Sequence, residues 1–273
     1  MSCCINALPQ FVAPADHKPR PAFSQRCGRA SQRCDIAHWL GFRVLPPIDP
    51  ASLERFPQRQ RCLNEHRARA MQAVMAAISH FFNISTGLVH CTVEKLAELC
   101  GLITVSKNGN RSITRASRCI QQMEHFGLLR CENEWNAALG VWYPKIIQVT
   151  PLFFEAINIA EKDWQAAIHQ QQAYQRQGLA GPQEQLSQEE ARERQITQLR
   201  EIHLKAKLAR QEIKRARKLQ QLTLQQQRRQ ISQSIVKSLN QPKIVALGLP
   251  GIQKLVNQKL WEFRRLLSHS PPA

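Results

Sequence analysis

The residues of this sequence best suited to bind another molecule are polar side chains that recur at helical spacing within one stretch. In "NGNRSITRASRCIQQMEHFGLL", residues 108–129, Arg115, Arg118 and Gln122 are separated by three and four positions. An α-helix places residues at this spacing on one face. Arginine can donate two hydrogen bonds to guanine O6 and N7, and glutamine can pair in the same way with adenine N6 and N7. The spacing and the residue types therefore suit a helix face that reads base edges in double-stranded DNA.

The helix that must position these side chains is predicted by an apolar stripe on its other side, formed by Ile113, Ala116, Ile120 and Met123. Ser112 is suited to cap its N-terminus and Gly127 to end it. Beside the base-reading face, Arg111, Ser112 and Thr114 carry groups that can bind DNA phosphates. A solvated surface is the more common role of charge on one side of a helix, so the rest of the chain has to decide between the two interpretations.

The composition favours a polyanionic partner. Lys and Arg number 38 against 20 Asp and Glu in 273 residues, which gives a formal net charge of +18. Such an excess suits DNA, RNA or an anionic membrane surface. The sequence has no apolar run of about 18 residues and no basic start of a signal peptide, so we expect no membrane span and a cytosolic protein. Aromatic residues are only 6% of the chain, which disfavours single-stranded RNA, because its readers stack bases on aromatic rings.

Three predicted helices followed by a predicted β-hairpin give the order of a winged helix-turn-helix domain, which we place at residues 56–160. The first helix is expected at about 58–83, the second in "CTVEKLAELCG", and the arginine-faced helix is the third. Two β-rich runs at about 128–132 and 141–149 predict the hairpin. In this fold the third helix enters the major groove and the hairpin can touch the backbone, which would bring Lys145 near a phosphate.

Outside this domain the composition changes along the chain. Residues 1–55 contain many of the 15 prolines and predict a flexible arm. Residues 161–230 predict a Gln-rich linker and a long basic helix, which lacks Gly and Pro over 188–232. Residues 231–273 predict an amphipathic helical region that packs in a core or contacts a second copy of the chain in a homodimer. The expected fold class is mainly α with a small β-hairpin.

The long basic helix carries half of the net charge of the chain. Between residues 191 and 230 there are 12 basic and three acidic residues, a difference of +9. A solvated helix or a coiled-coil strand is the simpler interpretation, but so one-sided a charge favours contact with the DNA backbone. The residues expected to make this contact are Lys205, Lys207, Arg210, Lys214, Arg215, Arg217 and Lys218.

The sequence gives little support for catalysis. A phosphate-binding P-loop and the motifs H-E-x-x-H and G-x-S-x-G are absent. Tyr143 and Tyr174 could serve as strand-nicking nucleophiles, but no accompanying histidine cluster is readable, and packing of their rings is the favoured interpretation. Cys27 and Cys34 do not have the spacing of a zinc site, and the nine cysteines are expected to be reduced thiols. We expect no enzymatic activity, no cofactor and no metal.

Three segments carry a resemblance to a known family: "VEKLAELCGLITVSKNGNRSITRASRCIQQMEHFGLL", "YPKIIQVTPLFFEAINI" and "LARQEIKRARKL". Over roughly residues 60–220 the chain resembles the RepA replication-initiation proteins of IncFII-type plasmids. The resemblance implies a protein that binds double-stranded DNA at a plasmid origin and helps to open it. It also implies recruitment of the host initiator ATPase and the replicative helicase, and a part in plasmid copy control.

Two other functions remain open at this point. A winged-helix transcriptional regulator would bind near a promoter and would need no contact with a helicase. A nicking enzyme would convert supercoiled plasmid to open circles with metal alone.

Overall fold

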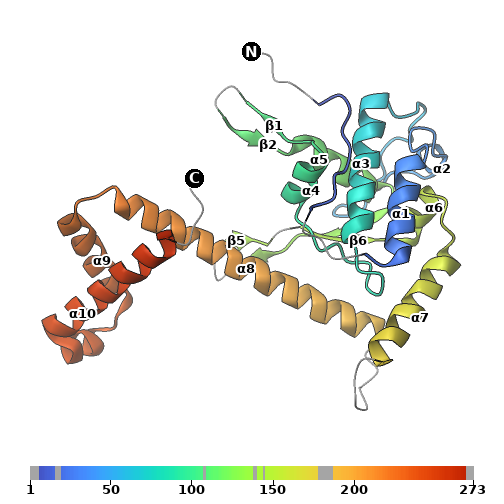
Figure 1. The fold of residues 1–273 in the computed structure, drawn as a ribbon. Helices are drawn as coiled ribbons and strands as arrows, with labels where there is room; N and C mark the ends of the chain where they lie inside the picture. The colour runs from blue at the N-terminus through green and yellow to red at the C-terminus, as the bar shows by residue number, and fades with distance from the viewer. Residues whose placement is uncertain are drawn as a thin grey trace. The chain divides into compact units, whose positions relative to one another are not determined.

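The structure is a computed structural model that describes residues 6–15, 20–106, 109–137, 140–143, 145–177 and 187–268. It is mainly helical with small antiparallel sheets, as the sequence predicted (Figure 1). The chain divides into two compact units, Met1–Arg200 and Glu201–Ala273, which are described in turn.

The elements of the first unit are, in chain order, α1 (Ala22–Arg33), α2 (Gly41–Val44), α3 (Glu65–Phe81), α4 (Val93–Leu99), β1 (Thr104–Val105), β2 (Arg111–Ser112), α5 (Thr114–His125), β3 (Leu129–Glu132), β4 (Trp135–Asn136), β5 (Val141–Trp142), β6 (Ile146–Val149), α6 (Pro151–Ala156) and α7 (Glu161–Gln177). The next helix begins in the first unit and ends in the second, and two more follow it: α8 (Gln188–Gln220), α9 (Leu224–Ser238) and α10 (Gln241–Ser268). The three helices and the hairpin expected in the central region are thus present as α3, α4, α5 and the strand pair β3–β6, although α3 begins only at Glu65 and the expected start at about residue 58 is wrong.

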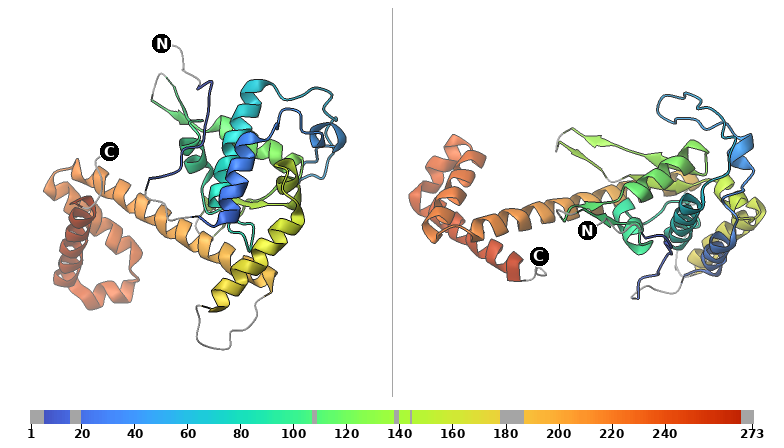
Figure 2. Two further views of the ribbon diagram at one scale, coloured as in Figure 1. Left: turned by 45° about the vertical axis from the view of Figure 1, so that its right-hand side comes forward. Right: turned by 90° about the horizontal axis from the view of Figure 1, so that it is seen from above.

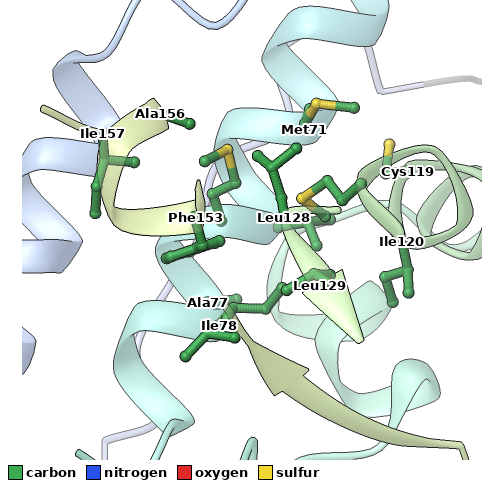
Figure 3. Close-up of a cluster of buried hydrophobic side chains, with 14 of the residues drawn as sticks. Met71, Ala77, Ile78, Cys119, Ile120, Leu128, Leu129, Phe153, Ala156 and Ile157 are labelled. Atoms are coloured by element: carbon green, nitrogen blue, oxygen red, sulfur yellow. The ribbon is translucent and has the colours of Figure 1, made fainter. Parts of the chain in front are cut away.

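The apolar side of α5 anchors it in the core of the first unit. Ala116, Ile120 and Met123 are buried, as their spacing predicted. Figure 3 shows Ile120 beside Leu129 of β3 among side chains that α3, α5 and the region of α6 contribute. A fully buried Ile or Met side chain contributes about 1.5–3 kcal/mol of transfer free energy. With this side fixed in the core, the arginine side of α5 is turned outward.

A two-part hairpin follows α5. β3 pairs antiparallel with β6, starting with Leu129 opposite Val149. An isolated bridge from Leu88 to Gln148 extends the pairing on the other side of β6. Farther out, β4 pairs with β5, and the rings of Trp135 and Trp142 are tilted by 59° to each other with centroids 5.3 Å apart. This hairpin follows α5 directly and shares its core.

The connection between α4 and α5 is longer and more regular than a simple turn. β1 and β2 form a short antiparallel ladder within it, with Thr104 opposite Ser112 (Figure 2). Ser112 is therefore a strand residue, and the prediction that it caps α5 is wrong, because Ile113 occupies the N-cap position. Gly127 ends the helix as predicted, with a φ of 74° that suits glycine. Thr92 caps α4, and its side chain accepts a hydrogen bond from the backbone of Lys95.

The N-terminal region contributes to the core, contrary to the flexible arm expected for residues 1–55. Figures 1 and 2 show α1 lying alongside α3, and Cys27 and Phe42 are almost fully buried. The two helices approach through small side chains, and Ser31 Oγ lies 3.0 Å from Ser79 Oγ in the interface. Small residues add little to a hydrophobic periodicity, which explains why the sequence pattern did not reveal α1 as a packed helix.

The segment from residue 161, which was expected to begin with a linker, contains α7 and the start of α8, and both pack on the first unit. In α7, Trp164 is buried and its indole N–H donates to the carbonyl of Ile84 at 2.9 Å. The first turns of α8 pack on the hairpin, where Ile196 joins a small buried cluster with Leu88 and Ile146. These contacts place the start of α8 in the first unit.

The second unit consists of the rest of α8 with α9 and α10. The single helix expected over residues 188–232 is wrong, because α8 ends at Gln220 and α9 starts after Thr223. The Thr223 side chain and the Gln226 side chain form a reciprocal capping box that fixes this start. α10 is interrupted at Gly248, whose φ is 57° and ψ is −177°. The amphipathic C-terminal helix predicted from the sequence is present and packs on α9.

The core of the second unit is small. Ile231 of α9 is buried together with Val256 and Leu260 of α10. Ile252 and Phe263 of α10 pack against them and are partly buried. The amphipathic face is thus used inside the unit.

The buried thiols lead to a prediction about stability at high pH. Burial raises the pKa of Cys27 and Cys100 from 9.0 to about 12, and that of Cys34 and Cys119 to about 11. Above pH 9 the unfolded chain loses these protons while the folded chain keeps them, so the free energy of unfolding should decrease as pH rises. Each thiol contributes a slope that approaches about 1.4 kcal/mol per pH unit between pH 9 and its folded pKa, and nothing below pH 9.

Chemical unfolding under reducing conditions from pH 7 to pH 11 checks this expectation. A Cys100→Ala variant serves as the control, because its pH dependence should be shallower than that of the wild-type protein. Equal slopes for the two proteins would show that ionisation of the Cys100 thiol does not contribute to alkaline unfolding.

Candidate nucleic-acid interface

The outward face of α5 is the first part of the candidate interface. Arg115, Arg118 and Gln122 lie on this face, as their spacing predicted, and all three line one open groove of about 520 Å³. Arg118 is exposed, while Arg115 and Gln122 are half-buried. The side chains of the groove can donate several hydrogen bonds at once, because each guanidinium group has five N–H donors.

The other wall of the groove contains residues to which the sequence reasoning gave no role. Arg59 comes from the segment before α3, and His66 and Arg67 come from the first turn of α3. The sequence signal for them is the basic run "RQRCLNEHRAR" at residues 59–69. Its convergence with α5 depends on tertiary packing, and a linear pattern does not show it.

The lining of the groove is rich in basic side chains. Four arginines and two histidines line it, and no carboxylate does so within the described part of the chain. The neighbouring acids are paired elsewhere: Glu65 with Arg69, and Glu124 with Lys145 at 2.9 Å. The positive charges of the groove are therefore not neutralised by these acids.

Arg115 already has a partner in the folded chain. Its Nη1 donates to the carbonyl of Asn6 at 2.8 Å, and the Asn6 side chain donates to the carbonyl of Gly101 at 3.2 Å. The backbone N–H of Val12 also donates to the carbonyl of Leu99 at 2.9 Å. The N-terminal segment thus runs beside α4 and holds one guanidinium of the groove in position.

The predicted phosphate contacts at the start of α5 lie together. Arg111 is exposed on β2, and the hydroxyls of Ser112 and Thr114 are 2.8 Å apart. The hydrogen bond and the charge of Lys95 lower the pKa of Glu98, and Arg111 adds a smaller effect in the same direction. Arg111 therefore lies near an acid that is already held by Lys95.

Lys145 does not fit the role that the sequence suggested. Its ammonium group is 2.9 Å from Glu124 and its side chain is 25% exposed, while the Glu124 side chain is 9% exposed. A lysine paired with a largely buried carboxylate is poorly placed to bind a phosphate, because leaving the pair would strand the buried charge. We therefore exclude Lys145 from the candidate interface.

The hairpin carries acids that are neutralised by α8. Glu132 is 2.8 Å from Arg192, and Glu134 is 2.6 Å from Arg200. The aromatic pair Trp135 and Trp142 is 47% and 60% exposed, and its rings pack on each other. The docked start of α8 thus removes two negative charges from the hairpin surface.

The basic residues of α8 form a separate surface in the second unit. Five of them are exposed: Lys205, Arg210, Lys214, Arg215 and Lys218. Lys207 and Arg217 are half-buried. Glu212, the acid among them, lies 3.9 Å from Lys259 of α10. Apart from Glu212, the charged side chains that are exposed between residues 205 and 218 are all basic.

Tyr143, one of the two tyrosines considered as nucleophiles, directly follows β5. The hydroxyl of Tyr143 accepts a hydrogen bond from the Asn136 side chain at 2.7 Å, and the side chain of Tyr174 lies outside the described part of the structure. Across the described residues, no three metal-ligating side chains gather at one place. The helices in the same ranges are too short or too polar to cross a membrane.

Taken together, the fold and the groove define a basic, mainly α-helical protein with an arginine-rich helix presented beside a β-hairpin. The model of the IncFII RepA protein family matches residues 1–268, so the chain belongs to this family. The family resemblance noted in the sequence is thereby confirmed.

Relatives with curated names agree with this result. The chain is 34% identical to the probable replication-associated protein repA1 of Buchnera aphidicola subsp. Schizaphis graminum over 275 residues, which cover 98% of this chain and 96% of the relative. It is 46% identical to the probable replication-associated protein repA1 of Buchnera aphidicola subsp. Cinara cedri over 160 residues, 57% of this chain and 56% of the relative. A replication initiation protein of Escherichia coli is 29% identical over 154 residues, 55% of this chain and 54% of the relative. No solved structure matches the chain significantly.

Proposed function

We propose that this protein initiates plasmid replication by binding double-stranded DNA at the plasmid origin. The observation that carries the proposal is the arginine face of α5, which a buried apolar stripe fixes in place and which lies in a chain of net charge +18. Membership of the IncFII RepA family and the replication initiation protein among its relatives point in the same direction.

In this proposal α3, α4, α5 and the hairpin act as a winged helix-turn-helix. The order of three helices and two strands fits that fold, with the β1–β2 ladder as an insertion between the second and third helices. α5 would enter the major groove, where Arg115, Arg118 and Gln122 contact base edges. Residues at its start, Arg111, Ser112 and Thr114, would contact phosphates.

The basic face of α8 would bind the DNA backbone without regard to sequence. Such contacts raise the affinity for every duplex, whereas base contacts decide between sequences. We further propose that the bound protein promotes opening of the origin, recruits the host initiator ATPase and the replicative helicase, and takes part in plasmid copy control. It would act in the bacterial cytoplasm without catalytic activity of its own.

A titration of the purified protein against its origin fragment and against a scrambled duplex of equal length tests the proposal. The measurement is repeated between 50 and 200 mM salt, where six to ten phosphate contacts would reduce affinity by roughly 10³- to 10⁵-fold. A preference for the origin that persists as salt rises supports sequence-specific binding. If the binding curves for the origin and the scrambled duplex coincide, the protein binds polyanions without regard to sequence. A preference for a promoter fragment would favour a transcriptional regulator.

A further inference from the structure

The groove beside α5 is built by three segments that are distant in sequence. Arg59 comes from the loop before α3, Arg67 from the first turn of α3, and Arg115 and Arg118 from α5. Their guanidinium groups are charged at any physiological pH. Convergence of like charges from separate segments raises the energy of the empty groove, and a bound anion would lower it.

The loop that carries Arg59 is fixed to α5. The backbone N–H of Ile48 donates to the carbonyl of His125 at 2.8 Å, and the ring of Phe56 stacks on the His125 ring with centroids 5.0 Å apart. Within the loop, the N–H of Phe56 donates to the carbonyl of Pro47 at 2.8 Å. The position of Arg59 relative to α5 is therefore set by the fold.

Acids near the groove are occupied by other partners. The Asp49 carboxylate accepts hydrogen bonds from the Ala51 backbone at 3.0 Å and from the Ser52 hydroxyl at 3.1 Å. Glu65 pairs with Arg69 on the side of α3 away from the lining residues. Neither acid lines the groove, and no other carboxylate does so among the described residues, so the lining arginines can accept an external anion.

We propose that this groove binds phosphate groups of the DNA backbone, with Arg59 and Arg67 as phosphate ligands. The inference rests on the proposed function, because Arg115 and Arg118 belong both to the groove and to the base-reading face. A duplex read by α5 carries its phosphates on either side of the bases, and the groove continues directly from that face. The open shape of the groove suits a continuous polyanion better than an enclosed small molecule.

The experiment compares Arg59→Gln, Arg67→Gln and the double variant with Arg61→Gln in full-length protein. Arg61 is exposed, lies in the same basic run and does not line the groove, so it is a matched control. Loss of two phosphate contacts should reduce the slope of log affinity against log salt by about 1.8 and the affinity by about 30-fold at 0.15 M salt. The loss should be equal for the origin and for the scrambled duplex, and Arg61→Gln should change neither quantity.

An unchanged salt slope in the double variant would overturn the inference about the groove. The proposed function would still be supported in that case if the wild-type protein prefers the origin to the scrambled duplex. Arg59→Lys and Arg67→Lys keep the charge and should retain most of the slope, which separates lost contacts from misfolding. Competition with ATP at matched ionic strength tests the source of the phosphate. Displacement of DNA by micromolar ATP would show that the groove takes a free nucleotide, and would overturn its assignment to the DNA backbone.

Discussion

Replacing Arg118 with alanine is expected to lower the affinity for plasmid origin DNA by about 5- to 150-fold, equivalent to 1–3 kcal/mol, and to relax sequence preference. Arg118 is exposed at the centre of the α5 face, with no ion-pair partner among the described residues. A guanidinium that bonds guanine O6 and N7 discriminates against other bases, because a mismatched base leaves its donors unpaired. Most of the loss should therefore appear with the origin and little with the scrambled duplex.

The measurement is a pair of binding titrations at fixed salt, followed by selection from a randomised site. Arg33→Ala is a suitable control, because Arg33 is exposed on α1, outside the groove lining. It removes the same charge and should leave the origin preference intact. If Arg118→Ala retained wild-type affinity and preference, α5 could not be the recognition helix.

The sequence was sufficient to predict α5 and its orientation. The stripe of Ala116, Ile120 and Met123 repeats at helical spacing, so the side that enters the core, and hence the side that remains exposed, follows from a local pattern. The hairpin was equally predictable, because its two β-rich runs flank a short polar segment. Both features depend on residues close together in the chain.

Features that depend on contacts distant in sequence were not predictable in this way. α1 joins the core through Cys27, Ser31 and other small residues, which give a weak hydrophobic signal although they pack closely. Lys145 appeared free for phosphate because Glu124 is 21 residues away in the chain. The groove was not predictable for the same reason, because only the folded loop brings Arg59 close to α5.

The break between α8 and α9 is a different case. Its signal is local, because Thr223 and Gln226 have the spacing of a capping box. The absence of Gly and Pro from residues 188–232 favoured one continuous helix, but the capping box starts a new helix without either residue. The boundary between α8 and α9 therefore has a local cause in the side chains of Thr223 and Gln226.

Removing the exposed charge of α8 is expected to have the largest effect on affinity. Exchange of five residues for glutamine, which keeps helix propensity, leaves α8 helical and removes five positive charges: Lys205, Arg210, Lys214, Arg215 and Lys218. If each contacts a phosphate, the salt slope should fall by about 4.5 and the affinity at 0.15 M salt by about 5 × 10³-fold. Origin and scrambled DNA should lose affinity alike, because phosphates carry no base identity.

The outcome distinguishes the role of α8 from that of α5. Lys237→Gln on α9 removes one exposed charge from the same unit and should change the slope by less than about one. Circular dichroism of the five-residue variant should match the wild-type spectrum, since none of the exchanged side chains is buried. A variant that keeps the wild-type salt slope would show that α8 is a solvated helix. A variant that loses affinity for the origin alone would instead place α8 in base recognition, because backbone contacts would weaken both duplexes equally.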